Sequence, residues 1–270
     1  MKKLLAMVLA LAMVAAMAMT ASAENAVDYS KVKIGVILLH DDDSTYDRNF
    51  HEGIKEAAAN LGLSEDQVIV VPNIPESNDC YEKAMDLVDE GCTVIFADSF
   101  GHETFLAQAA SENPDVQFCH ATGTTAHTLG LDNFHNAFAS IYEGRYLAGV
   151  AAGLKLNELK EAGQLKSDAP MMGYVGAFTY AEVISGYTSF YLGAKSVCPD
   201  VTMKVQFTGS WYDETEEKNA AEALIAAGAD LISQHADSMG APSACEDAGI
   251  PNVSYNGSTV ANCPNTFIVA

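Results

Sequence analysis

The sequence predicts an α/β fold with two successive lobes, each built on a doubly wound parallel sheet. Three observations support this prediction. From residue 31 onward, short runs rich in Val and Ile alternate with longer segments of helical hydrophobic periodicity. The short runs are apolar along almost their whole length, which is typical of parallel strands covered on both faces. The alternation begins again near residue 140 without repeating the sequence, so two lobes are expected rather than one.

In the first half, helix patterns follow strand patterns and two of them end at a glycine. The helix pattern 50–61 ends at Gly62 and the pattern 80–89 ends at Gly91. Glycine is common there because it adopts the left-handed conformation that ends many helices. The expected elements are strand 32–39, helix 50–61, strand 67–71, helix 80–89, strand 93–97, helix 103–111, strand 116–120 and strand 133–139.

The second half opens with a long helix pattern over 141–156, and a polar stretch at 163–168 separates it from the next strand. Gly228 again ends a helix pattern. The expected elements are helix 141–156, strand 172–177, helix 183–196, strand 203–207, helix 214–227, strand 231–235, helix 241–248, strand 252–255 and strand 266–269. We therefore expect an N-terminal lobe at 31–140 and a C-terminal lobe at 141–270.

The first 23 residues have the features of a cleavable signal peptide rather than of the fold. Lys2 and Lys3 precede an apolar run over 4–19, and Ala21-Ser22-Ala23 provides the small residues that signal peptidase requires. The apolar run is short for a membrane span. We expect export to a periplasm or to the cell surface. Because no cysteine lies near the cleavage site, no lipid anchor is expected.

The charge of the chain excludes polyanionic partners. It carries 36 Asp and Glu against 14 Lys and Arg, a formal charge of −22, which opposes binding to nucleic acid or to anionic membranes. Hydrophobic residues make up 49% of the chain, enough for a folded core. The six cysteines match no known disulfide framework, so bridges and buried thiols both remain open.

The sequence lacks the motifs of several enzyme classes. It has no Gly-x-Ser-x-Gly nucleophile turn, no phosphate-binding Gly-x₄-Gly-Lys-Ser/Thr and no His-Glu-x-x-His. Asp41 and Asp47 form a carboxylate pair, but glycosidase chemistry depends on their separation. We expect a binding protein without catalytic residues, metal or cofactor.

Ligands of doubly wound sheets bind beyond the carboxyl ends of the strands, and these positions carry acids, aromatic residues and amides. The first strand leads into a segment that contains Asp41, Asp47, Phe50 and His51. Later strand ends lead to Thr122, to Trp211 and to Asp237. The mixture suits a neutral or cationic polar ring compound that carries hydroxyls. His40, Asp41 and His51 could instead bind zinc, although their spacing does not support it.

Four segments resemble the basic membrane protein family, the BmpA/PnrA-like substrate-binding proteins of nucleoside-type ABC importers. The segment 143–152, Glu-Gly-Arg-Tyr-Leu-Ala-Gly-Val-Ala-Ala, is similar to the family's Glu-Gly-x-Tyr-Leu-Ala-Gly helix. Asp41 followed by Asp47-Arg48-Asn49-Phe50 resembles the family's opening loop. Gly209-Ser210-Trp211-Tyr212-Asp213 with Lys218, and Gly228-Ala229-Asp230, resemble its second-lobe pattern. The similarity runs from about Lys31 to the end of the chain.

The resemblance implies a two-lobed, type I periplasmic-binding fold that closes over a nucleoside. By that resemblance Phe50 and Trp211 stack on the base, and Asp41 and Asp237 hold ribose hydroxyls. His51 replaces the family's usual Asn, and Thr122 replaces an Asp found in many members. These two departures also allow a free base or another heterocycle.

The implied partners are a small-molecule ligand and the permease subunits of an ABC importer, and we expect a monomer. Relative to the family, the C-terminal lobe is expected to be incomplete at residue 270. The alternative functions are a secreted nucleoside or glycoside hydrolase and a ligand-sensing module for a signalling receptor.

Overall fold

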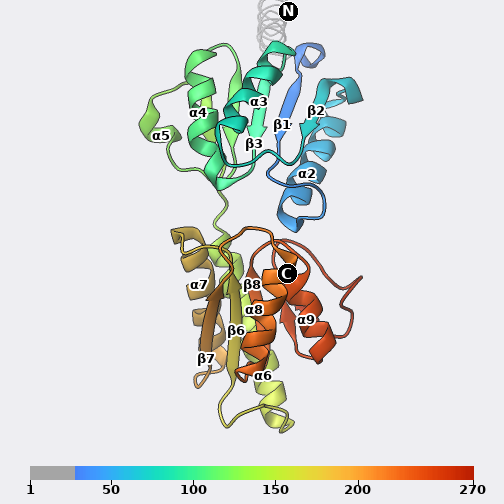
Figure 1. The fold of residues 1–270 in the computed structure, drawn as a ribbon, viewed down its shortest axis with the longest axis vertical. Helices are drawn as coiled ribbons and strands as arrows, with labels where there is room; N and C mark the ends of the chain where they lie inside the picture. The colour runs from blue at the N-terminus through green and yellow to red at the C-terminus, as the bar shows by residue number, and fades with distance from the viewer. Residues whose placement is uncertain (1–27) are drawn as a thin grey trace, which may run out of the picture.

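The computed structural model describes residues 28–270, so the expected signal peptide lies outside the described residues. The chain forms two five-stranded sheets, of order β2-β1-β3-β4-β5 and β10-β9-β8-β6-β7 (Figure 1). Every strand pair in both sheets is parallel. The predicted α/β fold with two parallel sheets is confirmed. We call the part built on the first sheet the N-terminal lobe and the part built on the second sheet the C-terminal lobe.

The N-terminal lobe follows the expected order of elements, with three short 3₁₀ helices and one short α-helix added. Its elements are η1 (Tyr29–Lys31), β1 (Ile34–Ile37), α2 (Thr45–Leu61), η2 (Glu65–Gln67), β2 (Val68–Val71), α3 (Asn78–Asp89), β3 (Val94–Ala97), η3 (Phe100–His102), α4 (Glu103–Glu112), β4 (Gln117–His120), α5 (Ala126–Leu129) and β5 (Phe134–Asn136).

The C-terminal lobe contains four long or medium helices between its strands. Its elements are α6 (Ile141–Glu161), β6 (Met171–Gly176), α7 (Ala181–Val197), β7 (Thr202–Phe207), α8 (Glu214–Ala226), β8 (Leu231–His235), α9 (Gly240–Ala248), β9 (Asn252–Val253) and β10 (Phe267–Val269). Within residues 28–270, no helix combines the length and the apolar character needed to cross a bilayer.

Helix α2 begins five residues before the helix expected at 50–61, and its first turn carries part of the site. Ser44 is its N-cap, because the Ser44 side chain accepts a hydrogen bond from the backbone N–H of Asp47. At the other end, Gly62 has a φ of 71° and closes the helix in the left-handed conformation. The expectation missed the first turn because its residues are mostly polar and contribute little to the hydrophobic periodicity.

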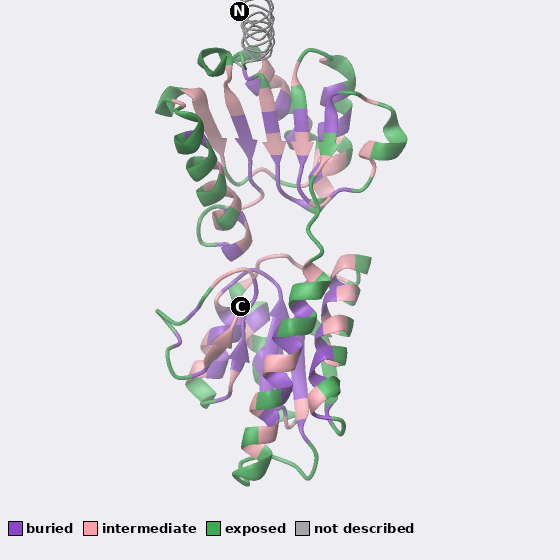
Figure 2. Cartoon of the chain, turned by 180° about the vertical axis from the view of Figure 1, so that it is seen from behind, coloured by how far each residue is buried: buried purple, intermediate pink, exposed green. Residues whose placement is uncertain are grey.

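Helices pack on both sheets through buried apolar side chains. In the N-terminal lobe, α3 and α4 bury Ala84, Leu87 and Leu106 against strand residues such as Ile95 and Phe118. In the C-terminal lobe, α6 and α7 pack on one face of the sheet and α8 and α9 on the other. Figure 2 shows the resulting concentration of buried residues along the strands of the C-terminal lobe. All six cysteines are free thiols, and five of them are buried.

Helices α6 and α7 pack with almost no space between their backbones. A Cβ atom at Gly149 would lie 2.0 Å from the carbonyl oxygen of Phe190, and one at Gly193 would lie 2.0 Å from the carbonyl oxygen of Tyr146. Gly149 belongs to the segment 143–152 that resembles the family helix. The glycine of that motif is therefore required by helix packing.

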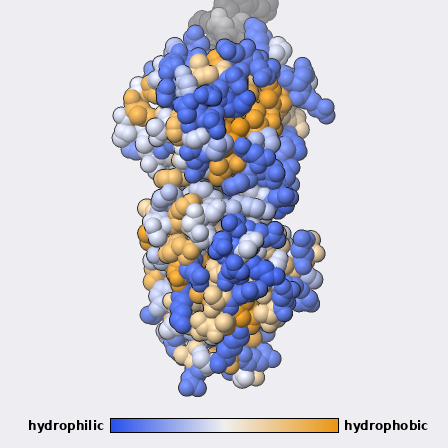
Figure 3. All heavy atoms as spheres, in the orientation of Figure 1, coloured by the Kyte–Doolittle hydropathy of each residue, from blue (hydrophilic) through white to orange (hydrophobic). Residues whose placement is uncertain are grey.

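The two lobes meet at a waist where the carboxyl ends of both sheets face each other. The segment over residues 137–140 connects β5 to α6 and joins the lobes (Figure 1). Hydrophilic residues dominate much of the surface in Figure 3, with apolar patches on both lobes, and the lobes touch along the waist. Any ligand that binds beyond the strand ends is therefore placed between the lobes.

Candidate ligand site between the lobes

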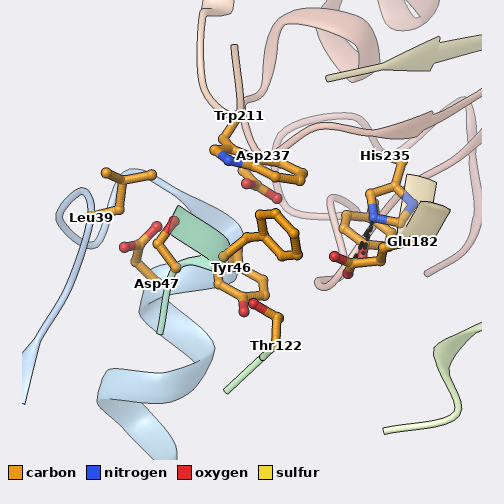
Figure 4. Close-up of a pocket in the computed structure, with 11 residues that line it drawn as sticks. Leu39, Tyr46, Asp47, Thr122, Glu182, Trp211, His235 and Asp237 are labelled. Atoms are coloured by element: carbon orange, nitrogen blue, oxygen red, sulfur yellow. Dashed lines mark hydrogen bonds and ion pairs between the residues drawn. The ribbon is translucent and has the colours of Figure 1, made fainter. Parts of the chain in front are cut away.

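A cavity lies between the lobes at the carboxyl ends of the strands (Figure 4). Both lobes contribute to its wall, which contains several aromatic rings and three carboxyl groups. The lining residues are Leu39, Tyr46, Asp47, Ser99, Phe100, Thr122, Glu182, Trp211, His235, Asp237 and Tyr255. Lys and Arg are absent from this lining, so the wall offers acceptors and rings but no cation.

Four residues expected at the site from the sequence come together in this cavity. Asp47 and Thr122 reach it from the N-terminal lobe, and Trp211 and Asp237 from the C-terminal lobe (Figure 4). They arrive from separate strand ends, as the rule for doubly wound sheets predicts. The hydroxyl oxygen of Thr122 and the indole Nε1 of Trp211 are buried and have no hydrogen-bond partner among residues 28–270. Both are therefore available to a ligand.

The other three residues expected from the sequence, Phe50, Asp41 and His51, do not line this cavity. Phe50 lines a neighbouring cavity, which shares Tyr46, Thr122, Glu182 and Tyr255 with the first. The Phe50 ring packs between the rings of Tyr46 and Phe96, at centroid distances of 4.8 and 5.3 Å.

Asp41 and His51 line a separate, open hollow on the N-terminal lobe, together with Asp42, Asp43 and Pro72. The His51 Nδ1 lies 2.7 Å from a carboxylate oxygen of Asp42. His40 instead lies 3.4 Å from Asp47, measured from Nδ1 to Oδ2. Within residues 28–270, no cluster of His, Cys, Asp or Glu side chains is arranged to hold a metal ion.

Asp47 is held in place by its own helix turn and by the loop that follows β1. Its carboxylate accepts hydrogen bonds from the backbone N–H of His40 at 2.8 Å and from the Ser44 hydroxyl at 2.5 Å. Burial acts to raise the pKa of Asp47, but hydrogen bonds from His40 and Ser44 outweigh burial and leave that pKa below its ordinary value. Asp47 thus remains a fixed negative charge in the cavity wall.

Asp98, which follows β3, lies fully buried behind Asp47. One of its carboxyl oxygens accepts a hydrogen bond from the backbone N–H of Leu39 at 3.2 Å. Burial, and then the negative charge of Asp47, raise the pKa of Asp98 well above its ordinary value. The charge of Asp47 thus favours the protonated form of Asp98, which would limit the repulsion between the two carboxyl groups.

The C-terminal lobe contains a second buried acidic pair, Asp237 and Glu217. Burial, and then the charge of Glu217, raise the pKa of Asp237 well above its ordinary value. Burial also raises the pKa of Glu217 to about 7, although Glu217 accepts backbone hydrogen bonds from Ser238 and Asp213. A protonated Asp237 can donate a hydrogen bond to a ligand as well as accept one.

Aromatic rings form one side of the cavity. The Trp211 ring packs edge-on against Phe178 at 5.1 Å and lies 5.9 Å from Tyr180. Tyr180 in turn stacks on Phe178 at 5.0 Å, so the three rings support one another. Trp211 is thus held rigidly, as a platform for a planar ligand requires.

Direct hydrogen bonds connect the lobes beside the cavity. The backbone N–H of Thr45 donates to the carbonyl oxygen of Asp237 at 3.1 Å, and the Thr45 hydroxyl lies 3.2 Å from the same oxygen. The Asn49 side chain donates to the carbonyl oxygen of Asn256. The first turns of α2 therefore contact the loops after β8 and β9, and the structure represents the closed arrangement of the lobes.

Sequence reasoning missed one group of site residues, Glu182, His235 and Tyr255. Their side chains meet at the wall of the C-terminal lobe, where the Tyr255 hydroxyl lies 2.8 Å from His235 Nε2. The same His235 nitrogen lies 3.6 Å from a carboxylate oxygen of Glu182. His235 at the end of β8 could have been found from its position at a strand end. Glu182 lies within the first turn of α7, where a solvent-exposed acid is the ordinary expectation.

Lys218 and Asp230 belong to segments that resemble the family, but they do not line the cavity and make structural contacts. Lys218 forms a surface ion pair with Asp247 at 2.9 Å. Asp230 accepts backbone hydrogen bonds from Lys166 at 2.7 Å and from Met171 at 3.0 Å. Asp230 therefore connects the polar loop at 163–168 to the start of β6.

A two-lobed α/β molecule that encloses a polar and aromatic cavity between its lobes has the architecture of a type I solute-binding protein. Among solved structures, an ABC transporter solute-binding protein from Aeropyrum pernix K1 superposes with a TM-score of 0.74 at 20% identity, covering 88% of this chain and 65% of that one. At this identity the likeness shows the fold alone.

The model of the family described as "ABC transporter substrate-binding protein PnrA-like" matches residues 31–270, and the chain belongs to this family. It is 33% identical to a purine-binding protein of Brucella abortus over 267 residues, covering 98% of this chain and 70% of the relative. It is 29% identical to the nucleoside-binding protein BmpA of an ABC transporter from Lactococcus lactis, over 56% of this chain and 39% of the relative. The protein is thus an ABC transporter solute-binding protein, a class that works outside the cytoplasm with a solute and a permease as partners.

Proposed function

We propose that this protein binds a purine or pyrimidine, as the free base or the nucleoside, and delivers it to the permease of an ABC importer. The observation that carries the proposal is the composition of the cavity between the lobes. It combines a supported Trp211 ring with the acceptors Asp47, Asp237 and Glu182, and it includes no Lys or Arg. A flat, uncharged nitrogen heterocycle matches both properties, because its faces stack on rings and its N–H groups donate to carboxylates. The names of the Brucella and Lactococcus relatives support the same class of ligand.

The residues expected from the sequence are assigned as follows in this proposal. Trp211 stacks on the heterocycle, while Thr122 and Asp237 bind its polar edge or a ribose hydroxyl. Asp47 acts mainly by its charge, because its carboxylate already accepts hydrogen bonds from its own lobe. Phe50, in the neighbouring cavity, supports Tyr46 and contacts only a ligand that extends beyond the base.

Closure of the lobes is the proposed binding mechanism. The cavity wall is divided between the lobes, so a ligand completes its contacts only when both lobes enclose it. A ligand with these differential contacts shifts the population from open to closed. The permease then recognises the closed form, in which Thr45 and Asp237 are hydrogen-bonded across the cleft.

Titration calorimetry of the protein with adenine, hypoxanthine, uracil and their nucleosides tests this proposal. We expect saturable binding of at least one compound with one site per chain, and chromatography of the same sample is expected to recover the compound unchanged. Release of free base from a nucleoside would instead establish the hydrolase alternative. Absence of binding across the whole panel would overturn the proposal.

A further inference from the structure

Glu182 presents a carboxylate to the cavity without a protein group that satisfies it. The Glu182 side chain is 12% exposed and lines both neighbouring cavities. Within residues 28–270 it has no hydrogen-bond donor, and its nearest basic group is His235 Nε2, at 3.6 Å. The acceptor capacity of this carboxylate is therefore available to a bound solute.

His235 lies beside Glu182 but does not neutralise it. The His235 ring packs at a tilt against Tyr255, at a centroid distance of 4.2 Å, and fits against α7 only because residue 186 is glycine, where a Cβ would lie 2.7 Å from His235 Nδ1. Burial lowers the pKa of His235, although the neighbouring Glu182 acts to raise it. The imidazole is therefore neutral at ordinary pH and leaves the charge of Glu182 uncompensated.

The nearby buried cation does not compensate the charge either. Arg145 lies under the rings of Phe190, Tyr255 and Tyr174, with its guanidinium carbon 5.1, 5.5 and 5.6 Å from their centroids. Its hydrogen bonds go to the carbonyl oxygens of Ser254 and Gln234 and to the Ser233 hydroxyl. Among the described residues no ion pair joins Arg145 to Glu182, and the positive charge of Arg145 disfavours a second positive charge on His235.

We propose that Glu182 is a specificity-determining residue that accepts an N–H group of the bound heterocycle and excludes anionic heterocycles, with His235 and Tyr255 as its positioning residues. This inference rests on the proposed function, and it narrows the ligand to uncharged compounds that present a ring N–H or an exocyclic amino group. Asp47 lines the same cavity from the N-terminal lobe and keeps its negative charge, so an anionic ligand would meet carboxylates from both lobes.

The test compares neutral and anionic purines on wild-type protein and on Glu182→Gln. The neutral probes are adenine and hypoxanthine, and the anionic probe is urate, which carries a negative charge at neutral pH. We expect wild type to bind a neutral purine at least 100-fold more tightly than urate. Glu182→Gln removes the charge but keeps the shape, so neutral binding is expected to weaken about 10- to 100-fold, the range for a hydrogen bond to a charged group. The neutral-to-anion ratio, which is the affinity for a neutral purine divided by the affinity for urate, is expected to fall at least tenfold in Glu182→Gln.

Two further variants separate this role from a structural one. Glu143→Gln removes an exposed carboxylate of α6 outside both cavities and is expected to leave the ratio unchanged. Tyr255→Phe keeps the ring but removes the hydroxyl beside His235, and it is expected to lower the ratio three- to tenfold if His235 holds Glu182 in place. Thermal melts of each variant confirm folding.

The outcomes distinguish this inference from the function on which it rests. If wild type binds no purine or pyrimidine, the proposed function fails. If wild type binds neutral purines but Glu182→Gln binds them equally well, or urate competes equally in both proteins, the assignment of Glu182 is wrong and the proposed function stands.

Discussion

The ring of Phe100, from the N-terminal lobe, stacks on the ring of Tyr180, from the C-terminal lobe, at a centroid distance of 5.2 Å and an interplanar angle of 28°. Phe100 lines the cavity, whereas Tyr180 lies outside its lining. The pair therefore connects the lobes beside the site, and each ring remains 40% exposed. Because this contact forms only when the lobes are closed, it stabilises the closed state relative to the open one.

Tyr180→Ala is expected to weaken ligand binding by removing the contact with Phe100 across the lobes and the support that Tyr180 gives to Trp211, since Tyr180 itself lies outside the cavity lining. An aromatic pair contributes about 0.5–1.5 kcal/mol beyond its buried area, so we expect the Kd to rise about two- to tenfold, mainly through faster dissociation. Stopped-flow fluorescence measures the rates. Tyr146→Ala, a similarly exposed tyrosine on α6, is the control and is expected to have no effect. A change confined to the association rate would contradict the explanation.

Trp211→Ala is expected to weaken binding more than Phe50→Ala does. Loss of stacking costs about 1–3 kcal/mol per base, and Trp211 lines the central cavity while Phe50 lies in the neighbouring one. Calorimetry with the tightest-binding base measures both variants, and Trp211→Phe is expected to restore part of the affinity. Equal losses in Trp211→Ala and Phe50→Ala would place the base between the two rings, as the family resemblance implies.

Gly149→Ala is expected to destabilise the C-terminal lobe by about 1–3 kcal/mol, because its Cβ would lie 2.0 Å from the carbonyl oxygen of Phe190 and force α6 and α7 apart. Gly144→Ala lies on the same helix, where a Cβ would have no neighbour within 4 Å. We expect that control to be neutral or to gain up to about 1 kcal/mol from higher helix propensity. Urea unfolding measures both, and similar stabilities for the two variants would refute the close packing.

Glu217 is expected to make the protein less stable as the pH rises from 4.5 to 7. Burial raises its pKa in the folded state to about 7, against an ordinary value of 4.5. Over this range the unfolded chain loses the proton while the folded chain keeps it, so ionisation favours unfolding. Ionisation of Glu217 therefore lowers the free energy of unfolding by roughly 3 kcal/mol. The loss is complete above pH 7 and absent below pH 4.5.

Glu217→Gln removes this titration and keeps a side-chain oxygen for the backbone N–H groups of Ser238 and Asp213. Its stability relative to wild type is expected to increase from pH 4.5 to pH 8, measured by urea unfolding at several pH values. Glu222→Gln, an exposed position on α8, is the matched control. A constant difference between Glu217→Gln and wild type across this range would show that Glu217 titrates normally.

Much of the site follows from strand order, which is visible in the sequence. Thr122, Trp211 and Asp237 were expected because they follow strands, and parallel strands bring their carboxyl ends to one edge of a sheet. Asp41 and His51 belong to the same loop and helix as Asp47, yet they lie in a different hollow. Asp47 lies in the first turn of α2, where the Ser44 hydroxyl and the His40 backbone N–H hold its carboxylate, whereas His51 lies one turn further along the helix and contacts Asp42.

The sequence by itself determined the two parallel sheets, the family and the acidic, aromatic character of the strand ends, because hydrophobic periodicity and glycine positions are local properties of the chain. Only the tertiary structure decided which of those residues share a cavity. Glu182 in α7, His235 in β8 and Tyr255 in the loop after β9 are separated by up to 73 positions, and they meet because α7 packs on the sheet with a glycine at 186. The pKa values of Asp98, Asp237 and Glu217 were likewise decided by burial, which depends on how distant segments pack.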